Sequence, residues 1–136
     1  MTRNAPTNSD DIIDKAGLGF RDYIVCALWS SVYCGPKEGP DAPEYMDDEV
    51  GIYDFDPETL RKLADEYRRF LTDCTDEIGY GFARAAHDFW LTRNHHGAGF
   101  WDTGRWPEED GKKMTEYAHK AGEVTLYVGD DGKVYA

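Results

Sequence analysis

The sequence predicts an α+β domain in which about three helices pack on a small antiparallel β-sheet. Three segments repeat apolar residues at helical spacing, at 20–33, 57–74 and 107–121. Two others, 88–102 and 123–135, are predicted to be β-hairpins because short apolar runs flank turn-forming residues. With 136 residues, of which 40% are hydrophobic, the chain is long enough to bury one core.

The chain is predicted to consist of a polar tail and one domain. Residues 1–11 lack an apolar run, so we expect a disordered tail without a signal peptide. Residues 12–136 then form a single α+β domain that includes an acidic loop at 35–56. No stretch is apolar for long enough to suggest a membrane span. The cysteines form no C-x-x-C pair, which favours a reducing compartment, and we expect a cytoplasmic protein.

The first helix is expected over residues 20–33. Its core-facing positions recur at helical spacing and are occupied by Phe20, Ile24, Ala27, Leu28 and Ser31. The apolar face is widened by Tyr23, Val25 and Trp29. Most of this helix is therefore predicted to be buried, and the sequence Cys34-Gly35-Pro36 is expected to end it.

The second helix has the clearest start signal. Asp56 is a good N-cap and Pro57 suits the first helical turn. Apolar residues then keep the core-facing spacing as far as Cys74. The third helix follows the same rules and is expected to close at Gly122.

The stretch His87–Asp102, with the sequence HDFWLTRNHHGAGFWD, combines large aromatic side chains with histidines, carboxylates and an arginine. We expect residues 88–93 and 98–102 to form two antiparallel strands joined by the His-His-Gly tip. An alternative continues a preceding short helix through Trp90 or Leu91. The sequence leaves both possibilities open.

Several side chains of this stretch have the chemistry of an acid–base or metal site. They are His87, Asp88, His95, His96 and Asp102. A carboxylate can fix the tautomer of an imidazole, and both groups are ligands for zinc or manganese. However, the stretch has no H-x-x-x-H spacing, no activated nucleophile and no phosphate-binding loop. We therefore assign no catalytic residue, no metal and no cofactor.

Arg93 lies among the aromatic residues of the same stretch. The favoured interpretation is structural: the guanidinium stacks on an indole and pairs with Asp88 or Asp102. In the alternative, the aromatic residues form a binding platform. Stacking on nucleic-acid bases would require basic surroundings, whereas this chain is acidic.

The charge of the chain is strongly unequal, with 27 acidic and 15 basic residues and a net charge of -12. A chain of this charge repels phosphates, so direct binding to DNA or RNA is disfavoured. The segment from Glu38 to Glu58 has nine acidic residues and no basic one. Apolar and aromatic residues alternate with them, so the loop either packs back onto the body or presents an acidic, aromatic face to a partner.

Closely spaced carboxylates with embedded aromatic rings can imitate the phosphate rows of a duplex. The leading hypothesis is therefore a non-enzymatic binding or inhibitor protein that occupies a basic surface of a host nucleic-acid-processing protein. The candidate partner-binding residues are Glu44, Tyr45, Asp47, Asp48, Glu49, Tyr53 and Asp54. The alternatives are a solvated loop, an oligomerising scaffold, or a small hydrolase. The hydrolase would use His87, Asp88, His96 and Asp102.

The central stretch and the C-terminal segment resemble a group of small, acidic phage and mobile-element proteins. The shared pattern is HDFWLTRN, one variable residue, HGAGFWD, and LYVGDDG nearer the C-terminus. Here these parts lie at 87–94, 96–102 and 126–132, and the resemblance does not extend to residues 1–56. It implies a phage-type origin, and such small proteins often interfere with host CRISPR or restriction complexes. It implies no activity.

Overall fold

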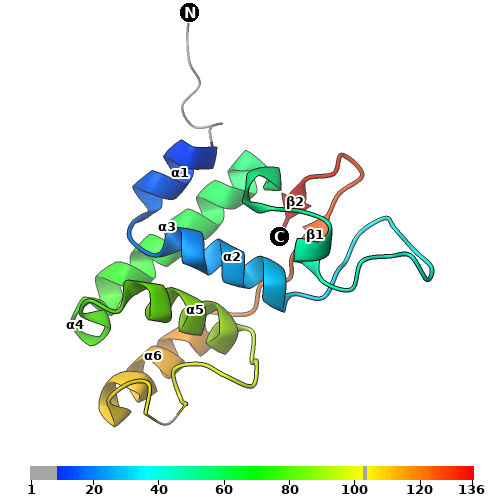
Figure 1. Ribbon diagram of the computed structural model, residues 1–136. Helices are drawn as coiled ribbons and strands as arrows, with labels where there is room; N and C mark the ends of the chain where they lie inside the picture. The colour runs from blue at the N-terminus through cyan, green and yellow to red at the C-terminus, as the bar shows by residue number, and fades with distance from the viewer. Residues whose placement is uncertain (1–8, 103) are drawn as a thin grey trace, which may run out of the picture.

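The computed structural model describes residues 9–102 and 104–136, which form a helix-dominated domain (Figure 1). Its α-helices are α1 (Ser9–Ala16), α2 (Phe20–Ser30), α3 (Pro57–Asp73), α4 (Thr75–Ile78), α5 (Phe82–Arg93) and α6 (Glu108–Ala121). The acidic loop contains the 3₁₀ turns η2 (Met46–Asp48) and η3 (Ile52–Asp54). The described strands are β1 (Tyr127–Val128) and β2 (Val134–Tyr135). The predicted α+β class, with helices packed on a sheet, is therefore wrong.

The hairpin predicted at 88–102 does not form. Residues 88–93 are the last turns of α5, and residues 94–102 are turns and bends. Helix α5 packs against both α2 and α6, so every side chain from Asp88 to Arg93 is buried. A short apolar run that is buried on all sides has no helical periodicity, and for this reason it resembles a strand in sequence. The alternative, a continued helix, is correct and extends further than expected, to Arg93.

The C-terminal hairpin predicted at 123–135 is present but shorter than expected. Tyr127 pairs with Tyr135 and Val128 with Val134, in antiparallel register. The turn between them is closed by the Gly129 N–H, which donates to the Lys133 carbonyl at 2.9 Å. Two paired residues per strand cannot support a sheet on which helices pack.

The predicted start of α3 and the predicted end of α6 are confirmed. The Asp56 carboxylate accepts a hydrogen bond from the Thr59 N–H at 3.0 Å, as an N-cap does. Gly122, with φ of 87°, ends α6. Helix α2 ends at Ser30 rather than residue 33, and two of its residues predicted to be buried, Val25 and Trp29, are each 43% exposed.

The predicted tail at 1–11 lies mostly outside the described residues. Ser9, Asp10 and Asp11, however, form the first turn of α1, which buries Ile12 and Ile13 against the body. These residues belong to the fold because the apolar side chains that follow them pack on α3. Of the described helices, none combines the length and the apolar character that crossing a membrane requires.

The core is largely aromatic and lies where α2, α3 and α5 meet. The rings of Phe70 on α3 and Phe89 on α5 stack at 4.3 Å with an interplanar angle of 9°. Tyr23 on α2 also stacks on Phe89, with the two ring centroids 5.5 Å apart. The Tyr67 hydroxyl donates to the Leu18 carbonyl at 2.6 Å and so ties α3 to the start of α2. These contacts fix α5, which carries the HDFWLTRN residues.

Candidate functional site

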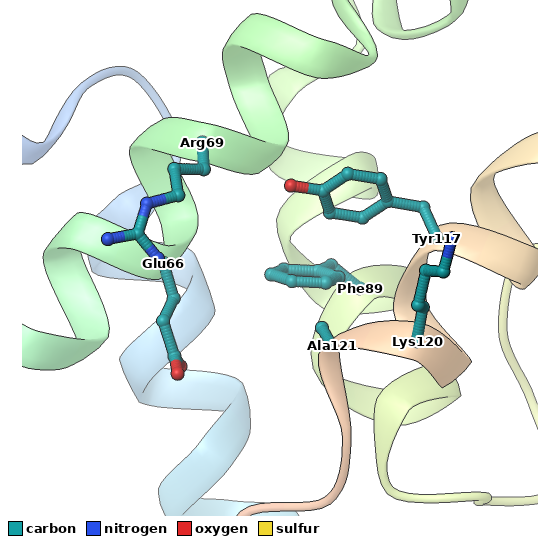
Figure 2. Close-up of a pocket in the computed structure, with 6 residues that line it drawn as sticks. All are labelled: Glu66, Arg69, Phe89, Tyr117, Lys120 and Ala121. Atoms are coloured by element: carbon teal, nitrogen blue, oxygen red, sulfur yellow. The ribbon is translucent and has the colours of Figure 1, made fainter.

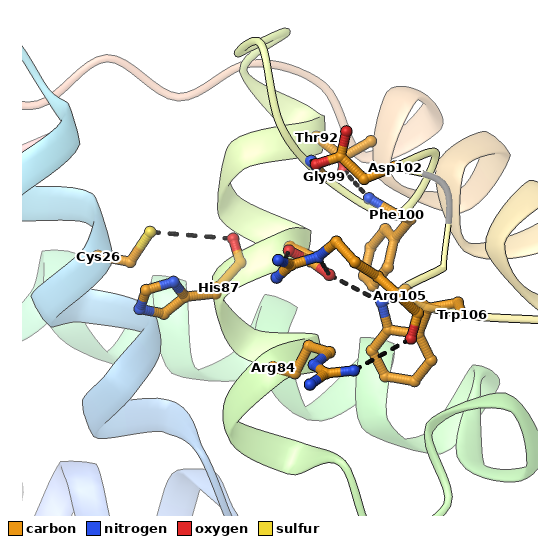
Figure 3. A network of polar contacts seen from close by, with 10 residues as sticks. Cys26, Arg84, His87, Thr92, Gly99, Phe100, Asp102, Arg105 and Trp106 are labelled. Carbon is orange, nitrogen blue, oxygen red and sulfur yellow. Dashed lines mark hydrogen bonds and ion pairs between the residues drawn. The ribbon is translucent and has the colours of Figure 1, made fainter.

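Asp88 is fully buried in α5 and binds two side chains that follow the central stretch. Its carboxylate accepts hydrogen bonds from Arg105 Nε at 3.2 Å and Nη2 at 2.9 Å. The Trp106 indole N–H donates to the same carboxylate at 2.7 Å. Figure 3 shows Arg105 and Trp106 lying against α5. The partners of Asp88 are thus a guanidinium and an indole rather than an imidazole, and they anchor the loop to the helix.

The loop between α5 and α6 is fixed by residues of the same motif (Figure 3). The Thr92 hydroxyl oxygen accepts a hydrogen bond from the Phe100 N–H at 3.0 Å. The Asp102 carboxylate accepts one from the Gly99 N–H at 3.2 Å. Gly99 has no room for a side chain, because an added Cβ would lie 2.2 Å from Thr92 Oγ1. Asp102 and Thr92 therefore hold the backbone of the loop.

Arg93 is only 1% exposed and has partners from several helices. Its Nη1 donates to the Tyr23 hydroxyl at 3.0 Å and to Glu66 Oε1 at 2.8 Å. Its other nitrogens donate to the carbonyls of Gly122 at 2.7 Å and Ala121 at 3.1 Å. The end of α6 is thereby tied to α5, α2 and α3.

The structural interpretation of Arg93 needs correction in its details. The guanidinium carbon lies 5.3 Å from the centroid of the Phe89 ring, which is not an indole. The paired carboxylate is that of Glu66, not Asp88 or Asp102. Burial lowers the pKa of Arg93, but the charge and hydrogen-bond interactions with Tyr23 and Glu66 outweigh burial and leave the pKa raised. The guanidinium remains charged within the core.

The histidines of the central stretch have separate surroundings. The His87 ring packs on Trp29 of α2, with ring centroids 5.7 Å apart. His95 adopts a left-handed conformation, with φ of 57°, and its ring stacks on that of His119 at 4.6 Å. The His96 N–H donates to the Leu91 carbonyl. Nowhere in 9–102 and 104–136 do three His, Cys, Asp or Glu side chains gather closely enough to hold a metal ion.

A pocket of about 240 Å³ lies between α3, α5 and α6 (Figure 2). Its lining comprises Glu66, Arg69, Phe89, Tyr117, Lys120 and Ala121. Glu66 is paired with Arg93, and the Tyr117 hydroxyl donates to Asp73 at 2.9 Å. Burial, followed by the interaction with Asp73, raises the pKa of Tyr117. No imidazole or thiol is among these lining residues, and two of the ionisable side chains, Glu66 and Tyr117, already have partners in Arg93 and Asp73.

The acidic loop is held at both ends by the C-terminal hairpin. The Val128 N–H donates to the Cys34 carbonyl at 2.7 Å, and the Asp56 N–H donates to the Val134 carbonyl at 3.0 Å. Near α2, the Met46 N–H donates to the Ser31 carbonyl at 2.9 Å. The loop also buries apolar side chains, namely those of Met46, Val50 and Phe55. It therefore packs back onto the body, one of the two possibilities that the sequence left open.

The candidate partner-binding residues all lie on the exposed side of this loop. Some of their carboxylates shape the loop: Asp48 accepts from the Tyr45 N–H at 3.0 Å, and Asp54 accepts from the Gly51 N–H at 2.8 Å. Glu49 forms an ion pair with Lys37 at 2.8 Å. Among the described residues, Glu44 and Asp47 form no hydrogen bond or ion pair through their side chains, so their full charge faces solvent.

Two exposed residues of α2 were missed as surface candidates. Val25 and Trp29 are predicted to widen the buried face, but each is 43% exposed; Tyr53 and Tyr45 of the acidic loop are 61% and 39% exposed. The signal was present in the spacing. Val25 and Trp29 lie four residues apart on α2, opposite to the buried positions of the same helix.

Compared with protein-family models, curated proteins and solved structures, the chain matches none of them.

Proposed function

We propose that this protein is a non-enzymatic binding protein whose acidic loop occupies a basic, nucleic-acid-binding surface of another protein. The partner would be a nucleic-acid-processing protein, such as a host defence complex of the CRISPR or restriction type. The single observation that carries the proposal is the arrangement of the loop carboxylates: they are exposed, close together and fixed by a folded backbone.

Fixed carboxylates support this function better than mobile ones. Two 3₁₀ turns and the contacts with the hairpin order the loop before any partner binds, so little conformational entropy is lost on binding. From Glu38 to Glu58, the only carboxylate that pairs with a cation in the described part of the chain is that of Glu49. A dense negative surface accelerates association with a basic partner and disfavours contact with nucleic acid itself.

A nuclease-treated pull-down from bacterial lysate tests the proposal. The loop variant carries Asp41→Lys, Glu44→Lys and Asp47→Lys, three positions where the side chain makes no contact that shapes the loop. The matched control carries Asp14→Lys, Glu116→Lys and Asp130→Lys, which are exposed elsewhere and change the net charge by the same amount.

The wild type and the control variant should recover the same nucleic-acid-binding protein, and the loop variant should not. Equal recovery by all three proteins would contradict the proposal, because the location of the charge would then have no effect. Loss with both variants would also contradict it, because net charge alone would explain binding.

A further inference from the structure

The exposed side of α2 carries an apolar stripe that continues into the acidic loop. On the helix it consists of Val25 and Trp29, each 43% exposed, and just beyond the end of the helix it includes Val32, which is 71% exposed. Tyr45 extends the stripe, because Val32 and Tyr45 face each other in an antiparallel bridge. Two exposed apolar residues on α2 are thus followed by an exposed pair just after the helix, in a chain with a mean hydropathy of -0.69.

Backbone hydrogen bonds join the stripe to the acidic loop. The Tyr33 N–H donates to the Glu44 carbonyl at 3.0 Å, and the Met46 N–H donates to the Ser31 carbonyl at 2.9 Å. These bonds join the residues that follow α2 directly to Glu44, Tyr45 and Met46. Within the stripe, the Trp29 ring packs on that of His87. An apolar centre with a charged rim is the usual anatomy of a protein interface.

We infer that the α2 stripe, formed by Val25, Trp29, Val32 and Tyr45, is the apolar anchor of an interface with a basic protein surface. This inference rests on the proposed function and specifies its partner: the basic surface has an apolar pocket that receives Trp29. Tryptophan is the residue type most enriched among those that dominate binding energy, whereas carboxylates at the rim mainly set association rate and specificity.

Charge favours a basic protein partner over a second copy of the chain. Each copy has a net charge of -12, so self-association would bring two strongly negative molecules together. A partner with lysines and arginines around an apolar pocket is complementary both to the loop carboxylates and to the α2 stripe. Binding to it should therefore have a salt-sensitive component, from the loop, and a salt-resistant component, from the stripe.

Two labelled synthetic peptides test this in direct binding experiments. The first is an amphipathic helix of leucine and lysine, and the second is an oligolysine with the same number of lysines. Affinities are measured by fluorescence anisotropy at low salt and at about 1 M salt, where the Debye length is about 3 Å. The variants are Trp29→Ala and, as a second change at a highly exposed side chain, Val32→Ser. Trp101→Ala is the matched control, because Trp101 is 54% exposed on another part of the surface.

The wild type should bind the amphipathic peptide about tenfold more tightly than oligolysine and should retain part of that binding at high salt. Trp29→Ala and Val32→Ser should reduce this preference, and Trp101→Ala should keep it. An unchanged preference in the two stripe variants would overturn the inference. A wild-type dimer that Trp29→Ala dissociates in sedimentation experiments would also overturn it, and would assign the stripe to a second copy.

Binding of oligolysine tests the proposed function separately from the stripe. The Asp41, Glu44 and Asp47 loop variant should lose it, while the Asp14, Glu116 and Asp130 control should retain most of it. Equal oligolysine binding by these two variants would contradict the proposed function. Failure of the stripe alone would leave the proposed function in place.

Discussion

Arg105 Nη2 lies 2.9 Å from Asp88 Oδ1, and this ion pair links the middle of α5 to the segment that precedes α6. The Asp88 side chain is fully buried, whereas that of Arg105 is 38% exposed. Trp106 is the second partner and donates a third hydrogen bond to the carboxylate. The first aspartate of the HDFWLTRN motif therefore organises the fold of the region that follows it.

Asp88→Asn should destabilise the domain by about 2 kcal/mol. The change removes the negative charge that binds the Arg105 guanidinium. It also replaces one acceptor oxygen by an NH₂ group, which cannot accept a hydrogen bond from Arg105 or Trp106. The magnitude lies below that for a fully buried pair because Arg105 is partly solvated. Urea denaturation measures it, with Asp130→Asn as the control at an exposed aspartate. Equal stability of the two variants would show that Asp88 has no structural role.

Gly99→Ala should be clearly destabilising, by about 1–3 kcal/mol, because overpacking forces neighbouring groups to move. The added methyl group would lie 2.2 Å from Thr92 Oγ1 and 3.3 Å from Thr92 Cβ, so the hydroxyl could not keep its bond to the Phe100 N–H. Gly97→Ala is the matched control in the same loop, where nothing lies within 4 Å. Thermal unfolding of both variants checks the prediction. A Gly99→Ala melting temperature equal to that of the wild type would contradict it.

The sequence predicted the helices well where local signals and periodicity agree. The Asp56 cap of α3 and the Gly122 end of α6 are examples. It failed for residues 88–93, because a helix buried on several sides shows no alternation of polar and apolar residues. The partners of Asp88 and Arg93 could not be predicted either. Glu66 is 27 positions from Arg93 and Arg105 is 17 positions from Asp88, and only the packing of the helices brings these residues together.

The surface was predicted only in part. The exposed acidic residues of the loop follow from composition, since carboxylates without partners stay in water. The contacts of Cys34 and Asp56 with the hairpin depend on distant chain segments and have no local signal. The exposure of Trp29 was missed because aromatic residues on a helix usually face the core. The available evidence was its spacing of four residues from Val25, which places the two side chains on one face of the helix.

One of the three cysteines should react rapidly in the native protein. Cys34 is exposed, whereas Cys26 and Cys74 are buried. Burial raises the pKa of Cys26 to about 12 and that of Cys74 to about 11, so neither forms a thiolate at pH 8. A thiol assay should count one reactive group in native protein and all three in guanidinium chloride. Rapid labelling of the native Cys34→Ser variant would contradict this arrangement.

The domain should lose stability as the pH rises from about 10 to about 12. Burial raises the pKa of Tyr23 from 10.0 to about 12 in the folded state. As the pH rises, the unfolded chain releases the Tyr23 proton before the folded protein does. The contribution of Tyr23 to the free energy of unfolding is therefore fully present below pH 10, and it is lost as the pH approaches the folded-state pKa of about 12. A shift of this size corresponds to roughly 3 kcal/mol.

Denaturant titrations measure this loss of stability. They are made at a series of pH values from 8 up to about 12, the folded-state pKa of Tyr23. Tyr23→Phe should be less stable at neutral pH, because Arg93 loses a partner, but its stability should depend less on alkaline pH. Tyr80→Phe is the control, because Tyr80 is 100% exposed. An identical pH dependence in wild type and Tyr23→Phe would show that Tyr23 does not contribute.

The most direct test of the central claim is competition with nucleic acid on the recovered partner. Labelled duplex is bound to that partner, and its release is followed by anisotropy as wild type, loop variant or control variant is added. Wild type and the Asp14, Glu116 and Asp130 control should displace the duplex, and the Asp41, Glu44 and Asp47 variant should not. A stable complex that contains the partner, the duplex and this protein together would contradict the account, because the acidic loop would then not occupy the nucleic-acid surface.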